Sequence, residues 1–202
     1  MRTAVAVAVA VLAVAGCSGG GGGADGKPSA SAPADEASAA PAAEVKSGGT
    51  LGGAGSACEL PVTFDIAEEW TVDSVDALWE MGPVSAACEI DARPAGHVGF
   101  IRVWTGEPGE DDPEAVLAAY LAVETGSTNS GVRYRPFEID GVTAVEVSYT
   151  TTDDLGERPD LAFALPTPDG PVIIDLDTPD AHEHGAMMPA YEMAKRTLRL
   201  AD

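Results

Sequence analysis

The sequence predicts an α+β domain in which an antiparallel β-sheet is flanked by helices. Residues 62–104 and 132–176 contain short segments in which apolar and polar residues alternate, as in half-buried strands. Asp140-Gly141 and Asp169-Gly170 separate such segments, and these pairs favour tight hairpins between antiparallel strands. Two other segments, 112–126 and 181–200, have helical spacing. Hairpins combined with two helices indicate the α+β class.

The first group of expected strands covers residues 62–66, 71–75, 84–90 and 98–104. In the first of these, apolar residues occupy every second position. A turn over 67–70 follows and brings Trp70 back onto the core. The last two strands are expected to pair as a hairpin, because Pro94 and Gly96 separate them.

The first helix is expected to begin at Asp112, whose side chain suits the N-cap, with Pro113 at the first helical position. Gly126 is expected to end it. Its apolar face consists of Val116, Leu117, Tyr120, Leu121 and Val123.

The second group of expected strands covers 132–139, 142–151 and the two halves of 160–176, and the hairpins turn at the two Asp-Gly pairs. The strand over 172–176 is apolar enough to be central in the sheet. The final helix spans 181–200. Because Pro189 lies inside this segment, the regular part of the helix is expected to begin only there.

Cys17 follows an uncharged apolar stretch, residues 4–15, that is too short to span a membrane and suits the core of a signal peptide. The stretch Val14-Ala15-Gly16-Cys17 resembles the lipobox of bacterial lipoproteins, in which the cysteine thiol accepts a diacylglycerol. Residues 1–16 are therefore expected to be removed, leaving Cys17 as the lipidated N-terminus. The alternative is an ordinary secretory signal with an incidental cysteine.

Residues 17–56 are expected to form a disordered tether, since Gly, Ala, Ser and Pro dominate and large apolar residues are scarce. Residues 57–202 are then expected to form a single globular domain, for which their length is suitable. A flexible tether is consistent with an anchor at its other end. We expect the protein to be held at the cell membrane, on its extracytoplasmic face.

Cys58 and Cys88 remain as a pair once Cys17 is lipidated. On the oxidising side of a membrane, two such cysteines predict a disulfide. Closing a loop of this length stabilises a fold by about 3 kcal/mol in the chain-entropy model. Their spacing is far from the C-x-x-C of redox sites, so we expect a structural bond.

The chain is strongly acidic, with a formal net charge of −22. Such a surface repels phosphate, which argues against nucleic acid as a partner. Solubility, or an acidic source proteome, is the simplest explanation for this charge. The domain is expected to be monomeric.

The lipobox-like stretch, the low-complexity tether, the segment "VTFDIAEEW" and the order of hairpins and helices together resemble the LpqN/LpqT type of actinobacterial lipoproteins. The resemblance covers Cys58 to Leu200 in element order and implies a PsbP-like sandwich of an antiparallel sheet between helices. Such folds often have a Pro-x-Gly-Trp turn after the first strand, where this sequence has Ala67-Glu68-Glu69-Trp70. The resemblance implies a non-enzymatic envelope protein that binds or assists other components.

Signatures of catalysis are absent from the sequence: it has no G-x-S-x-G, Walker A or G-x-G-x-x-G motif beside a strand, so we name no catalytic residue and no cofactor. One segment, "DLDTPDAHEHG", contains side chains that could hold a divalent metal. The candidate ligands are Asp175, Asp177, His182 and His184. Their spacing does not match a known metal motif. A polar loop leading into a helix is the alternative interpretation.

A second candidate site is an apolar interaction patch formed by Leu78, Trp79 and Met81 in the segment "DALWEMGPV". Simple packing beneath a loop is the alternative. His97 carries no functional hypothesis.

Three functions are compatible with these observations. The first is a membrane-anchored, non-enzymatic binding or interaction module with an envelope protein partner, which the tether would concentrate near the membrane. The second is a carrier of a small ligand or divalent metal, which predicts an open pocket between sheet and helix. The third is a hydrolase of unrecognised type, which would require a carboxylate with a raised pKa in a cleft.

Overall fold

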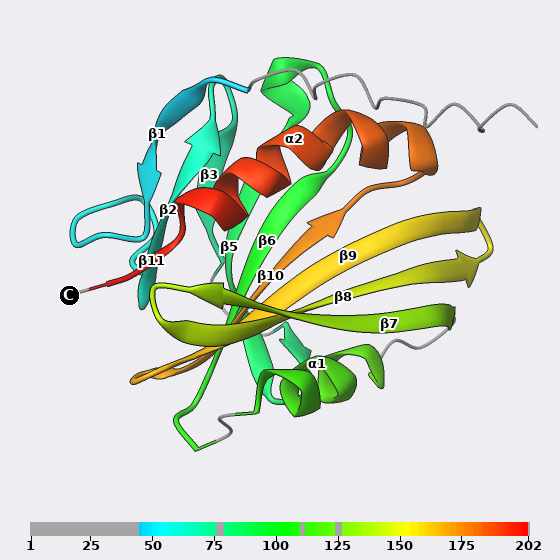
Figure 1. Cartoon of the computed structure of the whole chain (residues 1–202). Helices are drawn as coiled ribbons and strands as arrows, with labels where there is room; N and C mark the ends of the chain where they lie inside the picture. Colours follow the sequence, from blue (N-terminus) through cyan, green and yellow to red (C-terminus); the bar gives the residue numbers. More distant parts are fainter. Residues whose placement is uncertain (1–44, 76–78, 110–111, 124–126, 202) are drawn as a thin grey trace, which may run out of the picture. The chain divides into compact units, whose positions relative to one another are not determined.

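A computed structural model describes residues 45–75, 79–109, 112–123 and 127–201 (Figure 1). The strands are β1 (Ser47–Leu51), β2 (Val62–Ala67), β3 (Thr71–Ser74), β4 (Glu80–Met81), β5 (Val84–Asp91), β6 (Phe100–Gly106), β7 (Thr128–Ile139), β8 (Val142–Asp153), β9 (Gly156–Thr167), β10 (Gly170–Asp177) and β11 (Arg199–Leu200). The α-helices are α1 (Pro113–Leu121) and α2 (Ala181–Thr197), and Arg93–Ala95 form one turn of 3₁₀ helix.

The strands form two sheets. β1, β2 and β11 form a small sheet, and the larger sheet has the order β3-β5-β6-β10-β9-β8-β7, with β4 paired to β5. All pairings between these strands are antiparallel. The expected antiparallel sheet with helices is therefore present. The described residues contain only two α-helices, one of them nine residues long, so the expected sandwich is not confirmed.

The hairpins follow the predicted turns, with one shift. Asp140 and Gly141 both have positive φ, of 54° and 81°, as a two-residue turn of type I′ requires. In the β9–β10 hairpin, Thr167 already pairs with Gly170, so the turn lies at Pro168-Asp169, one residue earlier than expected. Gly170 belongs to the strand, where its φ of 116° brings it against the backbone of Gly106.

α1 begins as predicted. The side chain of Asp112 accepts a hydrogen bond of 3.1 Å from the backbone N–H of Glu114, and Pro113 is the first helical residue. Val116, Leu117 and Tyr120 are buried. Val123 is exposed instead, because the helix ends at Leu121. Gly126 lies outside the described residues.

α2 is continuous from Ala181, so the expectation that its regular part begins at Pro189 was wrong. The Asp180 side chain caps its first turn, accepting hydrogen bonds of 2.8 and 2.9 Å from two backbone N–H groups. The helix also buries Met187, Ala190, Tyr191, Met193 and Ala194. Burial of this face outweighs the one backbone hydrogen bond that Pro189 removes.

Regular structure is present within the segment that was expected to be a tether. β1 lies within the segment 17–56 assigned to the tether, pairs with β2 and buries Leu51. Backbone pairing with β2 does not depend on side chains, so composition gave no indication of it. The leader, Cys17 and the remainder of the tether before residue 45 lie outside the described residues.

The predicted disulfide is present. Cys58 and Cys88 are bonded, with their Cα atoms 6.2 Å apart, and both side chains are buried. Cys58 lies just before β2 and Cys88 lies in β5, so the bond connects the small sheet to the large one. It closes a loop that spans 30 residues in sequence.

The larger sheet has a hydrophobic core on each face. Along β10, Val172, Ile174 and Leu176 belong to the core beneath α2, whereas Ile173 belongs to the core beneath α1. Since neighbouring residues of a strand point to opposite faces, Asp175 lies on the α1 face together with Ile173. The two helices therefore cover opposite faces of the sheet (Figure 1).

Candidate functional site

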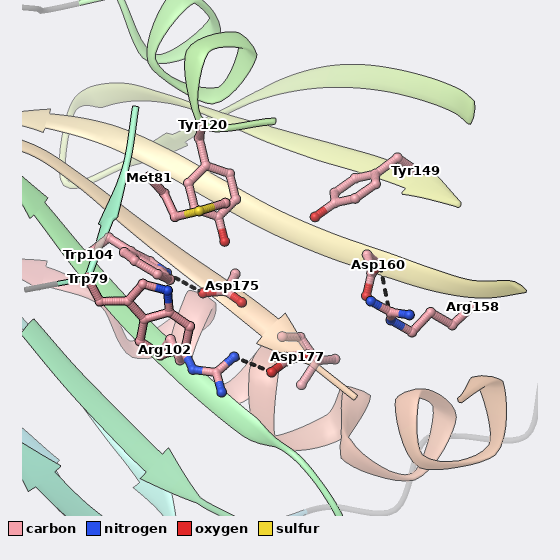
Figure 2. A pocket seen from close by; sticks show the side chains of 11 residues that line it. Trp79, Met81, Arg102, Trp104, Tyr120, Tyr149, Arg158, Asp160, Asp175 and Asp177 are labelled. Carbon is pink, nitrogen blue, oxygen red and sulfur yellow. Dashed lines mark hydrogen bonds and ion pairs between the residues drawn. The ribbon is translucent and has the colours of Figure 1, made fainter. Parts of the chain in front are cut away.

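A cavity of about 200 Å³ lies on the α1 face of the larger sheet (Figure 2). Aromatic and charged side chains form most of its wall. The lining residues are Trp79, Met81, Arg102, Trp104, Tyr120, Tyr149, Arg158, Asp160, Asp175, Leu176 and Asp177.

Strand register brings most of these side chains together. Asp175 of β10 lies opposite Arg102 of β6 and opposite Ala162 of β9. Two residues before Ala162, Asp160 points to the same face and lies opposite Tyr149 of β8. Four neighbouring strands thus place their polar side chains on one side of the sheet. Residues far apart in sequence form a continuous floor.

The ends of the cavity come from other elements. Tyr120 extends from α1, and Trp79 and Met81 come from the segment at β4 (Figure 2). α1 ends at Leu121 and is too short to cover the whole face. The part of the sheet that it leaves uncovered carries polar side chains.

The aromatic side chains are stacked edge to face. The ring centres of Trp79 and Trp104 are 5.3 Å apart, and those of Trp104 and Tyr120 are 5.6 Å apart. Both separations are favourable for aromatic pairs. Trp104 is almost fully buried, whereas 44% of Trp79 is exposed. Trp79 is thus the part of this row that solvent reaches most easily.

Arg102 is held by two carboxylates and two rings. Its Nε lies 2.6 Å from Glu89 Oε1, and its Nη1 forms an ion pair with Asp177. The guanidinium lies 4.8 Å from the ring centre of Trp79 and 4.8 Å from that of Phe100. Burial lowers the pKa of Arg102, but its neighbouring carboxylates, Asp177 first, outweigh this and raise it overall. Arg102 therefore stays charged.

Arg158 is likewise paired twice. Its Nη1 lies 2.5 Å from an oxygen of Asp153, and its Nε lies 3.6 Å from an oxygen of Asp160. Hydrogen bonding to Arg158 is the largest effect on Asp153 and lowers its pKa. Both cations of the cavity wall are thus neutralised by carboxylates of the same protein.

The pKa of the Asp175 carboxyl group is strongly shifted. Only 7% of the residue is exposed, and its Oδ1 accepts a hydrogen bond of 2.5 Å from the indole N–H of Trp104. Burial raises the pKa of Asp175 to about 7, although the bond from Trp104 opposes this shift. Near neutral pH this carboxyl group therefore exists in both protonation states.

The predicted metal ligands are not gathered in one place. Asp175 and Asp177 lie in β10 and contact Trp104 and Arg102, whereas His182 and His184 belong to the first turns of α2. The His182 side chain is largely exposed, and burial lowers the pKa of His184. Across the described ranges, no group of three or more His, Cys, Asp or Glu side chains is placed to hold a metal ion.

Two residues of the predicted interaction patch belong to the wall of the cavity. Trp79 and Met81 line it, and Leu78 lies outside the described residues. Trp79 packs against Trp104 and Arg102, so it belongs to the wall of a concave site and not to a flat apolar patch.

Most of the lining residues were not among the predicted site residues. Those missed are Arg102, Trp104, Tyr120, Tyr149, Arg158, Asp160 and Leu176. One signal was available in the sequence. Arg102 interrupts an apolar strand segment and Asp160 immediately precedes another, at positions that share a face with buried residues. A charged residue at such a position indicates either an edge of the core or a polar site.

No helix among the described residues is long and apolar enough to cross a membrane.

The model of one protein family, described as an uncharacterised lipoprotein, matches residues 28–198. The chain belongs to this lipoprotein family. The match includes the cavity and part of the predicted tether. Among curated proteins, no sequence matches the chain.

The fold of the lipoprotein is similar to that of a solved structure, cyanobacterial PsbP (CyanoP) from Synechocystis sp. PCC 6803. The two chains are 13% identical, with a TM-score of 0.54, and the similarity covers 75% of this chain and 98% of the other. The lipoprotein thus has a PsbP-like fold, as its sequence suggested. At this level of identity the similarity concerns the fold alone.

Proposed function

We propose that this lipoprotein is a non-enzymatic binding module on the extracytoplasmic face of the cell membrane, anchored through Cys17, and that its cavity holds a small polar ligand. The observation that carries the proposal is the cavity itself, in which aromatic rings and fixed charged groups converge from four strands and α1. Concave sites with a few convergent polar groups are the usual form of small-ligand sites.

The arrangement favours binding over a purely structural role. Arg102, Arg158, Asp160, Asp175 and Asp177 are held in position by contacts with other side chains. A site built on strands and fixed in this way is preorganised, which reduces the entropy lost on binding. The sequence suggested a protein partner that would dock on an exposed patch around Trp79. In the structure Trp79 lines the cavity, which favours a small ligand over a protein partner.

A panel of small cations, zwitterions, anions and neutral polar molecules tests this proposal. Binding is followed by tryptophan fluorescence, because Trp79 and Trp104 line the cavity. At least one class should change the fluorescence, and Trp79→Ala should weaken its binding about tenfold. Leu155→Ala, at a residue that is 83% exposed and does not line the cavity, is the control. The proposal fails if no class gives a response that depends on Trp79.

One observation favours a second candidate function. Asp175 is a buried carboxyl group with a pKa of about 7 in a cavity, which is the property of a general acid–base catalyst. Under this alternative, the lipoprotein would turn over a small substrate, and Asp175→Asn would abolish turnover while leaving binding largely intact. Product formation during prolonged incubation with ligands from the panel distinguishes catalysis from binding.

A further inference from the structure

The charged groups around the cavity are unequal in number. Its two guanidinium groups, Arg102 and Arg158, contact four carboxylates, those of Glu89, Asp177, Asp153 and Asp160. Of these carboxylates, only Asp160 and Asp177 line the cavity, together with Asp175, which accepts a hydrogen bond from the neutral indole of Trp104. The lining itself carries these two guanidinium groups and three carboxyl groups, so the wall is net negative when Asp175 is ionised, within a chain whose net charge is −22. An anionic ligand would meet this field and two guanidinium groups that are already neutralised.

The aromatic rings of the cavity also favour a positively charged ligand. An aromatic face attracts a cation, most strongly when the ring is an indole. The Arg102 guanidinium, itself paired with Glu89 and Asp177, lies 4.8 Å from the ring centre of Trp79. Trp104, Tyr120 and Tyr149 supply further aromatic surface around the Asp175 carboxylate (Figure 2).

The cavity also limits the size of its ligand. Its volume of about 200 Å³ is below that of sites for drug-sized molecules, which begin at about 300 Å³. At about 30 Å³ for each water of the liquid, it corresponds to about seven water molecules. The part of a ligand that lies inside the cavity must therefore be compact.

We propose that the cavity binds a compact organic cation, an ammonium compound held between the aromatic rings and the carboxylate of Asp175. This inference rests on the proposed function, since it names the ligand class of the same site. The positive group would lie against Trp79 and Trp104, and the second oxygen of Asp175 would face it. Arg102 and Arg158 do not balance all the carboxylates of the wall, and a bound cation would supply the missing positive charge.

The protonation state of Asp175 gives the proposal a second signature. Burial raises its pKa to about 7, Asp177 of the same strand and Asp160 of β9 also raise it, and Trp104 and Arg102 of β6 lower it. A bound cation stabilises the ionised carboxylate, so affinity should rise with pH through this range. If only the ionised form binds, affinity should increase about tenfold between pH 6 and pH 8.

The test compares choline with 3,3-dimethylbutan-1-ol, which has the same shape without the charge. The full-length protein, purified in a non-ionic detergent, is titrated with each compound by calorimetry. Choline should bind at least about tenfold more tightly than the alcohol. Equal or tighter binding of the alcohol would overturn the inference. Glycine betaine and sulfate, as a zwitterion and an anion, complete the series.

Two variants locate the effect. Asp175→Asn should weaken choline binding at pH 8 about tenfold and remove its pH dependence, whereas Asp169→Asn, at an exposed turn residue outside the cavity, should change neither. If Asp175→Asn does not fold, the pH profile of the wild-type protein decides, and a flat profile refutes the role of Asp175. If betaine or sulfate binds in the cavity and choline does not, the cation inference fails and the proposed function stands. If no compound of the wider panel binds, both fail.

Discussion

Replacing Asp175 by asparagine should stabilise the folded domain, and by more at high pH than at low pH. In the folded chain the carboxyl group has a pKa of about 7, against an ordinary value of 3.8. The folded state therefore binds more protons than the unfolded state between these two values, so its stability falls as pH rises from about 4 to about 7. Above this range, ionised Asp175 destabilises the fold by about 4 kcal/mol.

The difference between pH 5 and pH 8 gives the measurable quantity. At pH 5 Asp175 is largely ionised in the unfolded chain and protonated in the folded one, whereas at pH 8 both states are ionised. Over this interval the wild-type protein should lose about 2–3 kcal/mol relative to Asp175→Asn, which cannot ionise. Asparagine retains an oxygen that can accept the hydrogen bond from Trp104, so packing should be little changed.

Urea unfolding followed by tryptophan fluorescence measures both stabilities. Asp169→Asn is the control, because this carboxylate lies in the exposed β9–β10 turn. Its effect on stability should be the same at both pH values. The reasoning is refuted if Asp175→Asn changes the free energy of unfolding equally at pH 5 and pH 8, since burial would then not disfavour the charged form.

Other predictions concern the anchor, the disulfide and the last helix. Cys17→Ser should release the protein from the detergent phase in phase partitioning, and unchanged partitioning would contradict lipidation at this residue. Alkylation of the denatured, non-reduced protein should label neither Cys58 nor Cys88, and replacing both by alanine should lower stability by about 3 kcal/mol in urea unfolding. Asp180→Ala should lower it by about 1 kcal/mol, because two N–H groups of the first turn of α2 lose their acceptor, whereas an unchanged unfolding midpoint would show that this cap is dispensable.

The sequence was sufficient for features that depend on neighbouring residues. The Asp140-Gly141 hairpin, the start of α1 at Asp112 and Pro113, and most strands follow from local backbone preference and period-two patterning. The PsbP-like fold followed from the order of these elements together with the resemblance. The disulfide between Cys58 and Cys88 followed from their number and the expected oxidising compartment.

Features that depend on tertiary contacts were not predictable in this way. β1 exists because the backbone of β2 offers hydrogen bonds, and α2 continues through Pro189 because its buried face is large. The cavity required the register of four strands, which places Asp175, Asp160 and Arg102 on one face although Asp160 and Arg102 are 58 positions apart in the sequence. Sequence identified Asp175 and Asp177 as polar residues of interest, but it grouped them with the histidines that follow. The sequence by itself determined most of the elements and their order. Only the tertiary structure decided which side chains meet, because strand pairing, and not distance along the chain, sets which side chains are neighbours.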